Sequence, residues 1–229
     1  MDTPTGYADH PAPRESLDRE EGLIRDAVLR MGTLVEAAIR KASRALTAHD
    51  SKAALEVIEG DVVINDAQRA ASTLIVRTIA TQAPVARDLR YLLTLNHVTY
   101  ELERIGDHAS SVAKQVLKLA PEPPLEGYVH LPEMAELGAQ LVHGVLRALV
   151  DADADRARRV AVDDDQIDRL YHSTFDEVVE LMRQDPANVE RGTRIIIASH
   201  YLERIGDRAT NVAEDVVYLV TGDVEDLNP

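Results

Sequence analysis

The 229-residue chain contains no cysteine and no tryptophan, and its aromatic residues amount to seven tyrosines and one phenylalanine. The lack of cysteine excludes disulfide bonds and thiolate metal ligands, and it suits a reducing cytoplasm. Hydrophobic residues nevertheless make up 45% of the chain. An apolar content that is rich in Ala, Val and Leu but poor in aromatics is typical of packed helices, so the composition predicts an all-α protein.

Long hydrophobic runs are also missing. No segment approaches the roughly 20 consecutive apolar residues that a membrane-spanning helix needs. The first 21 residues are polar and acidic, and they lack the basic and apolar regions of a secretory signal. We therefore expect a soluble, cytoplasmic protein without a transmembrane segment.

Positive charge is scarce relative to negative charge. The chain has 25 Lys and Arg residues against 40 Asp and Glu residues, which gives a formal net charge of −15. Such a protein repels nucleic-acid phosphates and anionic lipid headgroups. Cations and basic protein surfaces are the partners that this charge favours, and no nucleic-acid partner is expected.

The most informative feature that is present is a repeat. The hexapeptide LERIGD occurs at residues 102–107 and again at 202–207, one hundred positions apart. Aligning residues 102–119 with 202–219 gives 11 identities in 18 positions. The chain is therefore an internal duplication, and a function that the hexapeptide carries should occur twice.

Apolar residues recur at helical spacing along most of the chain, and prolines and polar turns interrupt the pattern. The spacing predicts six long helices, at about 17–48, 52–82, 85–119, 132–150, 153–184 and 186–220. Long helices joined by short turns bury their apolar faces by packing antiparallel to one another. We therefore predict two tandem, pseudo-symmetric three-helix bundles.

The expected domain boundaries follow from the same pattern. The two bundles are expected to span residues 17–119 and 131–221. Closely spaced prolines in the segment between them cannot continue a helix. The remaining segments are a disordered arm at 1–16, a Pro-rich linker at 120–130 and a tail at 222–229.

Oxygen-bearing side chains four residues apart recur in both copies. The pairs are Asp61–Asn65 and Glu103–Asp107 in the first copy, and Asp164–Asp168 and Glu203–Asp207 in the second. Residues at this spacing share one helix face, so their oxygens can bind one cation. Two pairs on adjacent helices would supply three or four hard oxygen donors. We expect this carboxylate face to point to solvent or to a partner.

An ordinary solvated acidic face, with weak salt bridges from Arg104 and Arg204, is the alternative for these side chains. Retention of the hexapeptide in both copies argues against it. Gly106 and Gly206 also need a reason, because a glycine inside a helix costs about 1 kcal/mol relative to alanine. Close helix packing and access for a ligand would explain them equally well. His200 could add a nitrogen ligand, although the first copy has Tyr100 there.

These residues resemble the PhoU family, which regulates phosphate transport in bacteria. The resemblance rests on the paired ERIGD motifs with their following AxxVA, on VIEGDVVIN at 57–65 and on APVARDLR at 83–90. It extends over about residues 17–222. It implies two three-helix bundles, a homodimer, and a negative regulator of high-affinity phosphate uptake and of the phosphate-starvation response.

The resemblance also implies multinuclear metal sites on the bundle surfaces. Its ligands would be Asp61, Glu103 and Asp107 in the first bundle, and Asp164, Asp168, Glu203 and Asp207 in the second. Asn65 stands where the family pattern has a carboxylate, so the first site would carry less charge. Fe, Zn, Mn or Mg would suit such ligands. The implied partners are the sensor histidine kinase of the phosphate response and the ATPase subunit of the phosphate ABC transporter, which the protein would join as an adaptor.

Two other interpretations remain open on the residues. Carboxylate-bridged metalloenzymes also use acids on long helices, but they need ExxH motifs, and none occurs here. No P-loop, GxSxG or HExxH motif is present either, so we expect no enzymatic activity. The other interpretation is a helical scaffold that binds no metal.

Overall fold

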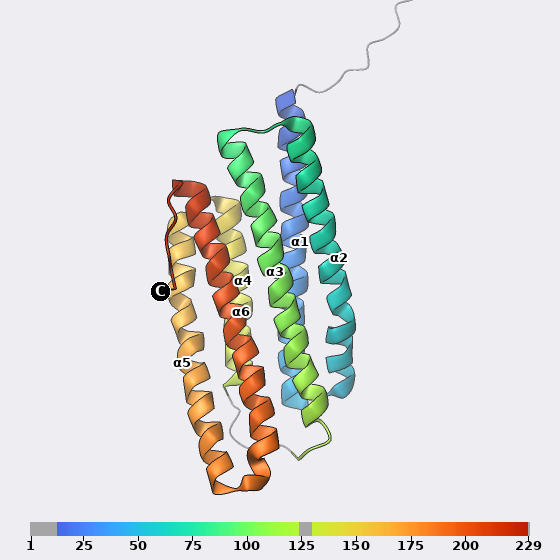
Figure 1. Cartoon of the computed structure of the whole chain (residues 1–229), viewed down its shortest axis with the longest axis vertical. Coiled ribbons are helices and arrows are strands. Elements are labelled where there is room, and N and C mark those ends of the chain that lie inside the picture. Colours follow the sequence, from blue (N-terminus) through green and yellow to red (C-terminus); the bar gives the residue numbers. More distant parts are fainter. Residues whose placement is uncertain (1–12, 124–129, 229) are drawn as a thin grey trace, which may run out of the picture.

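The computed structural model describes residues 13–123 and 130–228, and within these ranges every regular element is helical (Figure 1). The elements are α1 (Pro13–Ala48), α2 (Ser51–Gln82), α3 (Ala86–Leu119), α4 (Leu131–Asp151), α5 (Ala154–Gln184), a short 3-10 helix (Pro186–Asn188) and α6 (Val189–Thr221). The prediction of an all-α protein with six long helices is confirmed. None of the described helices has an apolar stretch long enough to cross a membrane.

Polar caps and special backbone conformations set the ends of the helices. The Asp50 side chain accepts hydrogen bonds from the backbone amides of Lys52 and Ala53 and so begins α2. Asp153 begins α5 in the same way, through the amide of Arg156. These caps satisfy amides that have no partner within the helix. Gly222, with a φ of 84°, ends α6 in the left-handed conformation that glycine adopts without strain.

Two boundaries differ from the predicted ones. The helix α1 begins at Pro13, inside the arm that was expected to be disordered through residue 16. Contacts with other elements hold its first turn, since Arg14 pairs with Asp88 at 2.6 Å and Ser16 accepts a hydrogen bond from Gln82. Residues 186–188 form a 3-10 turn, and α6 proper begins only at Val189. Residues 1–12, 124–129 and 229 of the expected arm, linker and tail lie outside the described residues.

The six helices form two antiparallel three-helix bundles, α1–α3 and α4–α6, that pack side by side. The helix α3 lies against α6 and α1 lies against α4, whereas α2 and α5 lie at opposite edges of the molecule (Figure 1). Buried apolar side chains of both bundles belong to one continuous cluster. The four inner helices therefore share one core, and each outer helix covers one side of its own bundle.

The seam between α3 and α6 reveals the symmetry of the duplication. Glu101, which is 4% exposed, lies 3.4 Å from Arg208, and His108 stacks on Tyr201 with ring centroids 5.8 Å apart. Positions 101 and 201 correspond in the repeat, as do positions 108 and 208. The contact of position 101 with position 208 is therefore repeated, with the two halves of the chain exchanged, by the contact of position 201 with position 108. A pseudo-two-fold axis therefore runs between α3 and α6, perpendicular to both helices.

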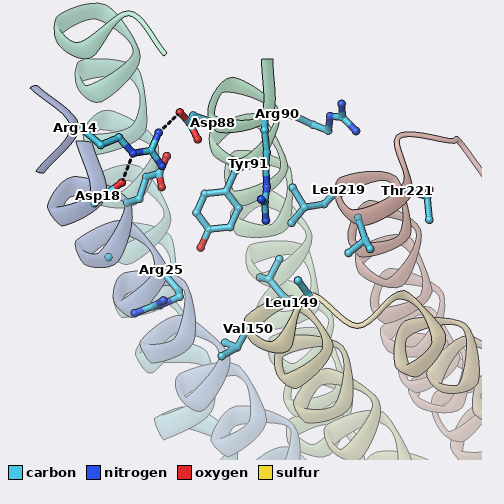
Figure 2. A pocket seen from close by; sticks show the side chains of 15 residues that line it. Arg14, Asp18, Arg25, Asp88, Arg90, Tyr91, Leu149, Val150, Leu219 and Thr221 are labelled. Carbon is cyan, nitrogen blue, oxygen red and sulfur yellow. Dashed lines mark hydrogen bonds and ion pairs between the residues drawn. The ribbon is translucent and has the colours of Figure 1, made fainter. Parts of the chain in front are cut away.

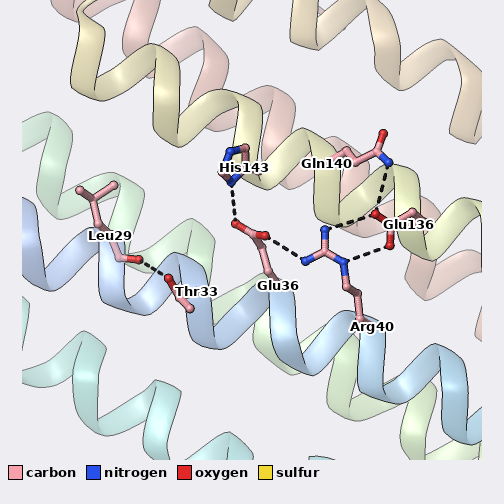
Figure 3. Close-up of polar contacts among 7 residues, drawn as sticks. All are labelled: Leu29, Thr33, Glu36, Arg40, Glu136, Gln140 and His143. Carbon is pink, nitrogen blue, oxygen red and sulfur yellow. Dashed lines mark hydrogen bonds and ion pairs between the residues drawn. The ribbon is translucent and has the colours of Figure 1, made fainter.

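A second polar seam joins α1 to α4 (Figure 3). The Arg40 guanidinium donates to both carboxylate oxygens of Glu136, at 3.0 and 3.3 Å, and to Glu36 at 3.0 Å. His143 lies 3.3 Å from the other oxygen of Glu36. A two-pronged arginine–carboxylate contact restricts sliding, so this network helps to set the register of one bundle on the other.

Both glycines of the repeated hexapeptide lie where the preceding helix approaches closely. A Cβ atom on Gly106 would lie 3.0 Å from Ile64 Cδ1 and 3.6 Å from Asp61 Oδ1. A Cβ atom on Gly206 would overlap Asp164 Oδ1. Close helix packing therefore accounts for the glycines, and in both copies an aspartate is part of the packed surface.

We expect Gly206→Ala to lower the free energy of unfolding by about 1–3 kcal/mol, because Asp164 must move to admit the methyl group. Gly60→Ala is the matched control, since nothing lies within 4 Å of its added Cβ, and it should raise stability by about 1 kcal/mol. Urea denaturation of the two variants measures both changes. Equal effects of the two substitutions would contradict the packing role of Gly206.

Candidate metal centres

The first set of predicted ligands lies along the groove between α2 and α3. Asp61 is half-buried on α2 and accepts a hydrogen bond from Asn65 at 3.1 Å through Oδ2. Burial raises the pKa of Asp61, and the negative charge of Asp107 on α3 raises it further. Burial also raises the pKa of Glu103, with added repulsion from Asp107 and Asp61. The three predicted carboxylates of this copy are therefore electrostatic neighbours.

The second set lies along the equivalent groove between α5 and α6. Asp164 is only 3% exposed, and its burial, together with the nearby Asp168, raises its pKa to about 7. Burial and the charges of Asp207 and Asp168 raise the pKa of Glu203 to about 7 as well. Burial and Asp207 likewise raise the pKa of Asp168. All four predicted carboxylates of this copy therefore repel one another in a partly desolvated groove.

The expected exposure of these faces is wrong in part. Asp107 is exposed and Glu103 half-exposed, but Asp164 is buried and Asp168, Glu203 and Asp207 are partly buried. The sequence pattern predicted only that the carboxylate face points to solvent or to a partner. It could not show how far α5 and α6 bury each other's acids, because that depends on the packing of these two helices.

One oxygen of the leading aspartate lacks a partner in both copies. Asp61 Oδ1 and Asp164 Oδ1 are buried and accept no hydrogen bond, and they are also the atoms that face the glycines. The other oxygen is bonded in each case, to Asn65 in the first copy and to Thr210 at 3.1 Å in the second. Glu203 Oε2 is buried without a hydrogen bond too. Unpartnered buried carboxylate oxygens are costly, and a cation would satisfy them.

The acids do not close around a common point. In the part of the chain that the structure describes, no group of three or more His, Cys, Asp or Glu side chains has the geometry to hold a metal ion. Arg204 pairs with Asp207 at 2.7 Å and so occupies one of the predicted ligands. The donor types and the unpartnered oxygens suit a hard cation, whereas the arrangement of the side chains does not enclose one.

The surroundings of the two sets differ. Lys114 lies close enough to Asp61 to oppose the rise in its pKa, whereas the second copy has Glu214 at the equivalent position of the repeat. The second groove also has histidines beside it. His200 Nδ1 lies 3.4 Å from Glu203 Oε2, and the His172 ring lies close enough to Asp168 to oppose the rise in its pKa. The second set is thus richer in possible ligands than the first.

Sequence reasoning missed several residues that contact the second set. Thr210 donates to Asp164, and it follows Asp207 by three residues on α6, a helical spacing that could have revealed it. Asn228, beyond the end of α6, donates to Asp207 Oδ1 at 3.3 Å. Nothing in the sequence pattern predicts the second contact.

The contact of Asn228 depends on the path of the C-terminal tail. Residues 223–228 fold back along α6, where Arg158 binds both oxygens of Glu225 at 2.9 and 2.6 Å. The Leu227 amide donates to Glu214 at 2.9 Å. These contacts bring the tail beside the second acidic groove, and the first groove has no such neighbour among the described residues.

Comparison with known proteins agrees with the duplicated architecture. The family model of the PhoU domain matches residues 28–116 and again residues 131–216. The phosphate-specific transport system accessory protein PhoU homolog of Clostridium acetobutylicum is 36% identical over 212 residues, which cover 92% of this chain and 96% of that protein. The homolog of the same name from Pseudomonas aeruginosa is 40% identical over 200 residues, covering 87% of this chain and 83% of that protein.

Two solved structures are also similar to this chain. The crystal structure of PhoU from Pseudomonas aeruginosa has a TM-score of 0.86 at 39% identity and covers 90% of this chain and 99% of its own. The phosphate transport system regulatory protein PhoU from Streptococcus pneumoniae has a TM-score of 0.84 at 32% identity, over 92% of this chain and 99% of its own. These relatives are named as accessory and regulatory proteins, which confirms the prediction of a non-enzymatic, regulatory role. The chain belongs to the PhoU family.

Proposed function

We propose that the protein is a negative regulator of high-affinity phosphate uptake and of the phosphate-starvation response. It acts in the cytoplasm as an adaptor between the ATPase subunit of the phosphate transporter and the sensor histidine kinase. The names of its relatives, which are accessory proteins of the phosphate-specific transport system, support the transport side of this role. The kinase side rests on the family resemblance of the repeated motifs.

We infer that the working surface, meaning the surface through which the protein contacts its partners, is the pair of acidic grooves with cations bound in them. The observation that carries this inference is the unpartnered oxygen of Asp61 and of Asp164, which recurs in both halves of the chain. Oxygen ligands and high negative charge suit Mg²⁺ or Mn²⁺, and Fe or Zn can also bind clustered carboxylates. A bound cation would neutralise acids that otherwise repel one another.

Each groove would hold its cation with the residues that the family resemblance names. In the second groove these are Asp164, Asp168, Glu203 and Asp207. In the first they are Asp61, Glu103 and Asp107, with Asn65 as a neutral donor in place of a fourth carboxylate. The nearby Lys114 lowers the affinity of the first groove further. We therefore expect the second groove to bind more tightly.

Because the pseudo-two-fold axis runs perpendicular to α3 and α6, which lie side by side in Figure 1, it relates one groove to the other at the same height along the axis. One partner could therefore contact both grooves at once. Charge favours a basic partner surface, since the chain carries a net charge of −15. A homodimer, in which two such faces are presented together, is part of the same proposal.

Metal analysis is the direct test of the grooves. We expect purified, tag-free protein to hold Fe, Zn, Mn or Mg, and Glu203→Ala/Asp207→Ala to lose more of it than Glu103→Ala/Asp107→Ala. Elemental analysis by mass spectrometry measures this. Asp176→Ala/Glu180→Ala is the control, because it removes two acids at the same spacing from an exposed face of α5. Equal metal content in all variants, after each ion is supplied in turn, would leave the metal-free scaffold as the better interpretation.

The pH dependence of stability should also reveal the second groove. In chelator-treated protein, Asp164 and Glu203 bind protons up to a pH of about 7 when folded, but only up to their ordinary pKa values of about 3.8 and 4.5 when unfolded. The folded state therefore holds more protons between about pH 4 and 7, and stability falls as the pH rises, by up to about 1.4 kcal/mol per pH unit for each group. Adding the bound cation should restore stability at pH 8.

Asp164→Asn tests this assignment. The variant keeps the shape of the side chain and removes its charge, so its stability should fall less steeply between pH 4 and 7. Asp176→Asn should leave the slope unchanged. Thermal unfolding of both variants, followed by circular dichroism across this pH range, measures the difference. Identical slopes for the two variants would refute the assignment to the groove.

The regulatory role needs a test in cells. In a strain that lacks the gene, we expect wild-type protein and Asp176→Ala/Glu180→Ala to restore repression of the starvation response at high phosphate. Glu203→Ala/Asp207→Ala should fail, and it should no longer retain the transporter's ATPase subunit in a pull-down. If that variant represses normally and retains the subunit, the acidic groove is not the working surface. If wild-type protein itself does not repress, the regulatory proposal fails as a whole.

A further inference from the structure

A cleft of about 1230 Å³ opens at the end of the molecule where both bundles meet (Figure 2). The N-terminal parts of α1 and α3 form one side, and the C-terminal ends of α4 and α6 form the other. Figure 2 shows Tyr91 on one side of the cleft and Val150 and Leu219 on the other, so the cleft has apolar as well as charged walls. It is remote from the acidic grooves, which lie farther along the helices.

The arginines that line this cleft outnumber its carboxylates by one. Four arginines line it, Arg14, Arg25, Arg87 and Arg90, against the three carboxylates of Asp18, Glu21 and Asp88. The cleft, called the arginine cleft below, is therefore locally positive in a chain whose net charge is −15. Burial and the neighbouring Asp88 raise the pKa of Glu21, and the nearby Arg14 opposes this rise.

The three carboxylates leave some hydrogen-bond donors of these arginines without a partner. Asp88 and Asp18 both bind Arg14, at 2.6 and 2.8 Å, as the dashed lines in Figure 2 show. Arg87 forms no hydrogen bond or ion pair with a described residue, although it lies close enough to Glu21 to lower the pKa of that acid, and the ion pair of Arg25 is with Asp26, at 3.9 Å. Two guanidinium groups at the cleft are thus left with unused donors.

The backbone of the cleft adds to its preference for anions. The helix α3 begins there, and its N-cap residue Val85 provides no side-chain cap. The free amides of a helix N-terminus attract negative charge, and phosphate groups use them together with arginine. Gly22, on the α1 wall, has nothing within 4 Å of an added Cβ, so helix packing does not require this glycine.

The opposite half of the duplication shows that packing does not require the arginines either. Counting one hundred residues on from Arg87 and Arg90 gives Ala187 and Glu190, at the start of the sixth helix. The acidic motifs were retained in both copies, whereas these positive charges occur in only one. The arginine cleft is therefore a feature of one end of the molecule and has no duplicated counterpart.

We propose that the arginine cleft binds a small anion with two or more phosphate groups, of the nucleotide or oligophosphate class. Arg25 and Arg87 would bind the phosphate oxygens, and the first turn of α3 would contribute its amides. Tyr91, Val150 and Leu219, which are exposed or half-exposed, provide apolar surface for a base or another uncharged part of the ligand. Because the site involves no acidic groove and no cation, it is independent of the function proposed above.

An acidic peptide segment of a partner protein is the rival occupant. Arginine binds carboxylates as readily as phosphates, and the cleft is open enough for a chain. The uncapped N-terminus of α3 favours the compact charge of a phosphate group over the carboxylates of a peptide. The small anion is therefore the better occupant of the cleft.

The test is direct binding to the full chain in a chelating buffer, so that no cation links the probe to the acidic grooves. Isothermal titration calorimetry with ATP, pyrophosphate and orthophosphate should show binding of ATP and pyrophosphate that weakens with added salt. Arg25→Glu and Arg87→Glu should each weaken it by about tenfold or more. Gly22→Leu should also weaken it, because the side chain fills the cleft without changing charge.

Arg183→Glu is the matched control, since it makes the same charge change at an exposed position at the other end of the molecule. It should leave the affinity for ATP unchanged. Equal loss in Arg87→Glu and Arg183→Glu would overturn the proposal, because general charge repulsion would then explain both. Binding of a Glu-rich peptide that depends on Arg87, without binding of ATP or pyrophosphate, would overturn it in favour of a protein partner. Absence of any binding would overturn it as well.

Discussion

In each half of the chain an aspartate oxygen lies against a helical glycine, and this contact determines both how closely the helices pack and what chemistry lies between them. Asp164 reaches Gly206 because the glycine has no side chain, and Asp61 approaches Gly106 in the same way. The approach buries an oxygen that no protein group satisfies. Desolvation of that kind raises a carboxylate's pKa and increases its need for a cation. Helix packing and the proposed cation binding would thus both follow from one contact, rather than being alternatives.

The fold follows from the sequence more completely than the site does. Helical periodicity, prolines and the repeat suffice to predict six helices in two bundles, because helix boundaries depend on local caps and turns such as Asp50 and Gly222. The start of α1 at Pro13 was missed because it depends on the distant Asp88. The local sequence predicts local structure, whereas contacts between helices become known only from the three-dimensional structure.

The predicted ligands illustrate the same limit. Spacing identified the four pairs of oxygen donors and their helices, which the structure places along two grooves. It could not identify the burial of Asp164, the hydrogen bond from Thr210 or the approach of Asn228, since each arises from residues of another element or from the returning tail. The unequal charge of the grooves, with Lys114 in one and Glu214 in the equivalent place, was visible in the sequence. Its meaning required the knowledge that Lys114 lies close to Asp61 across the helix contact.

The duplication provides an internal comparison that separates general features from special ones. Features in both copies, such as the acids and glycines, are general to the repeated unit. Two features occur only once among the described residues: the arginine cleft at one end, where both bundles meet, and the C-terminal tail beside the second groove. A symmetric protein offers the same surface twice and cannot distinguish its ends. The pseudo-two-fold axis relates the two grooves to each other, but it relates neither the cleft nor the tail to an equivalent feature. These asymmetric features therefore make the two ends of the molecule different. An adaptor that joins two different proteins needs such a difference, since otherwise each half would bind the same partner.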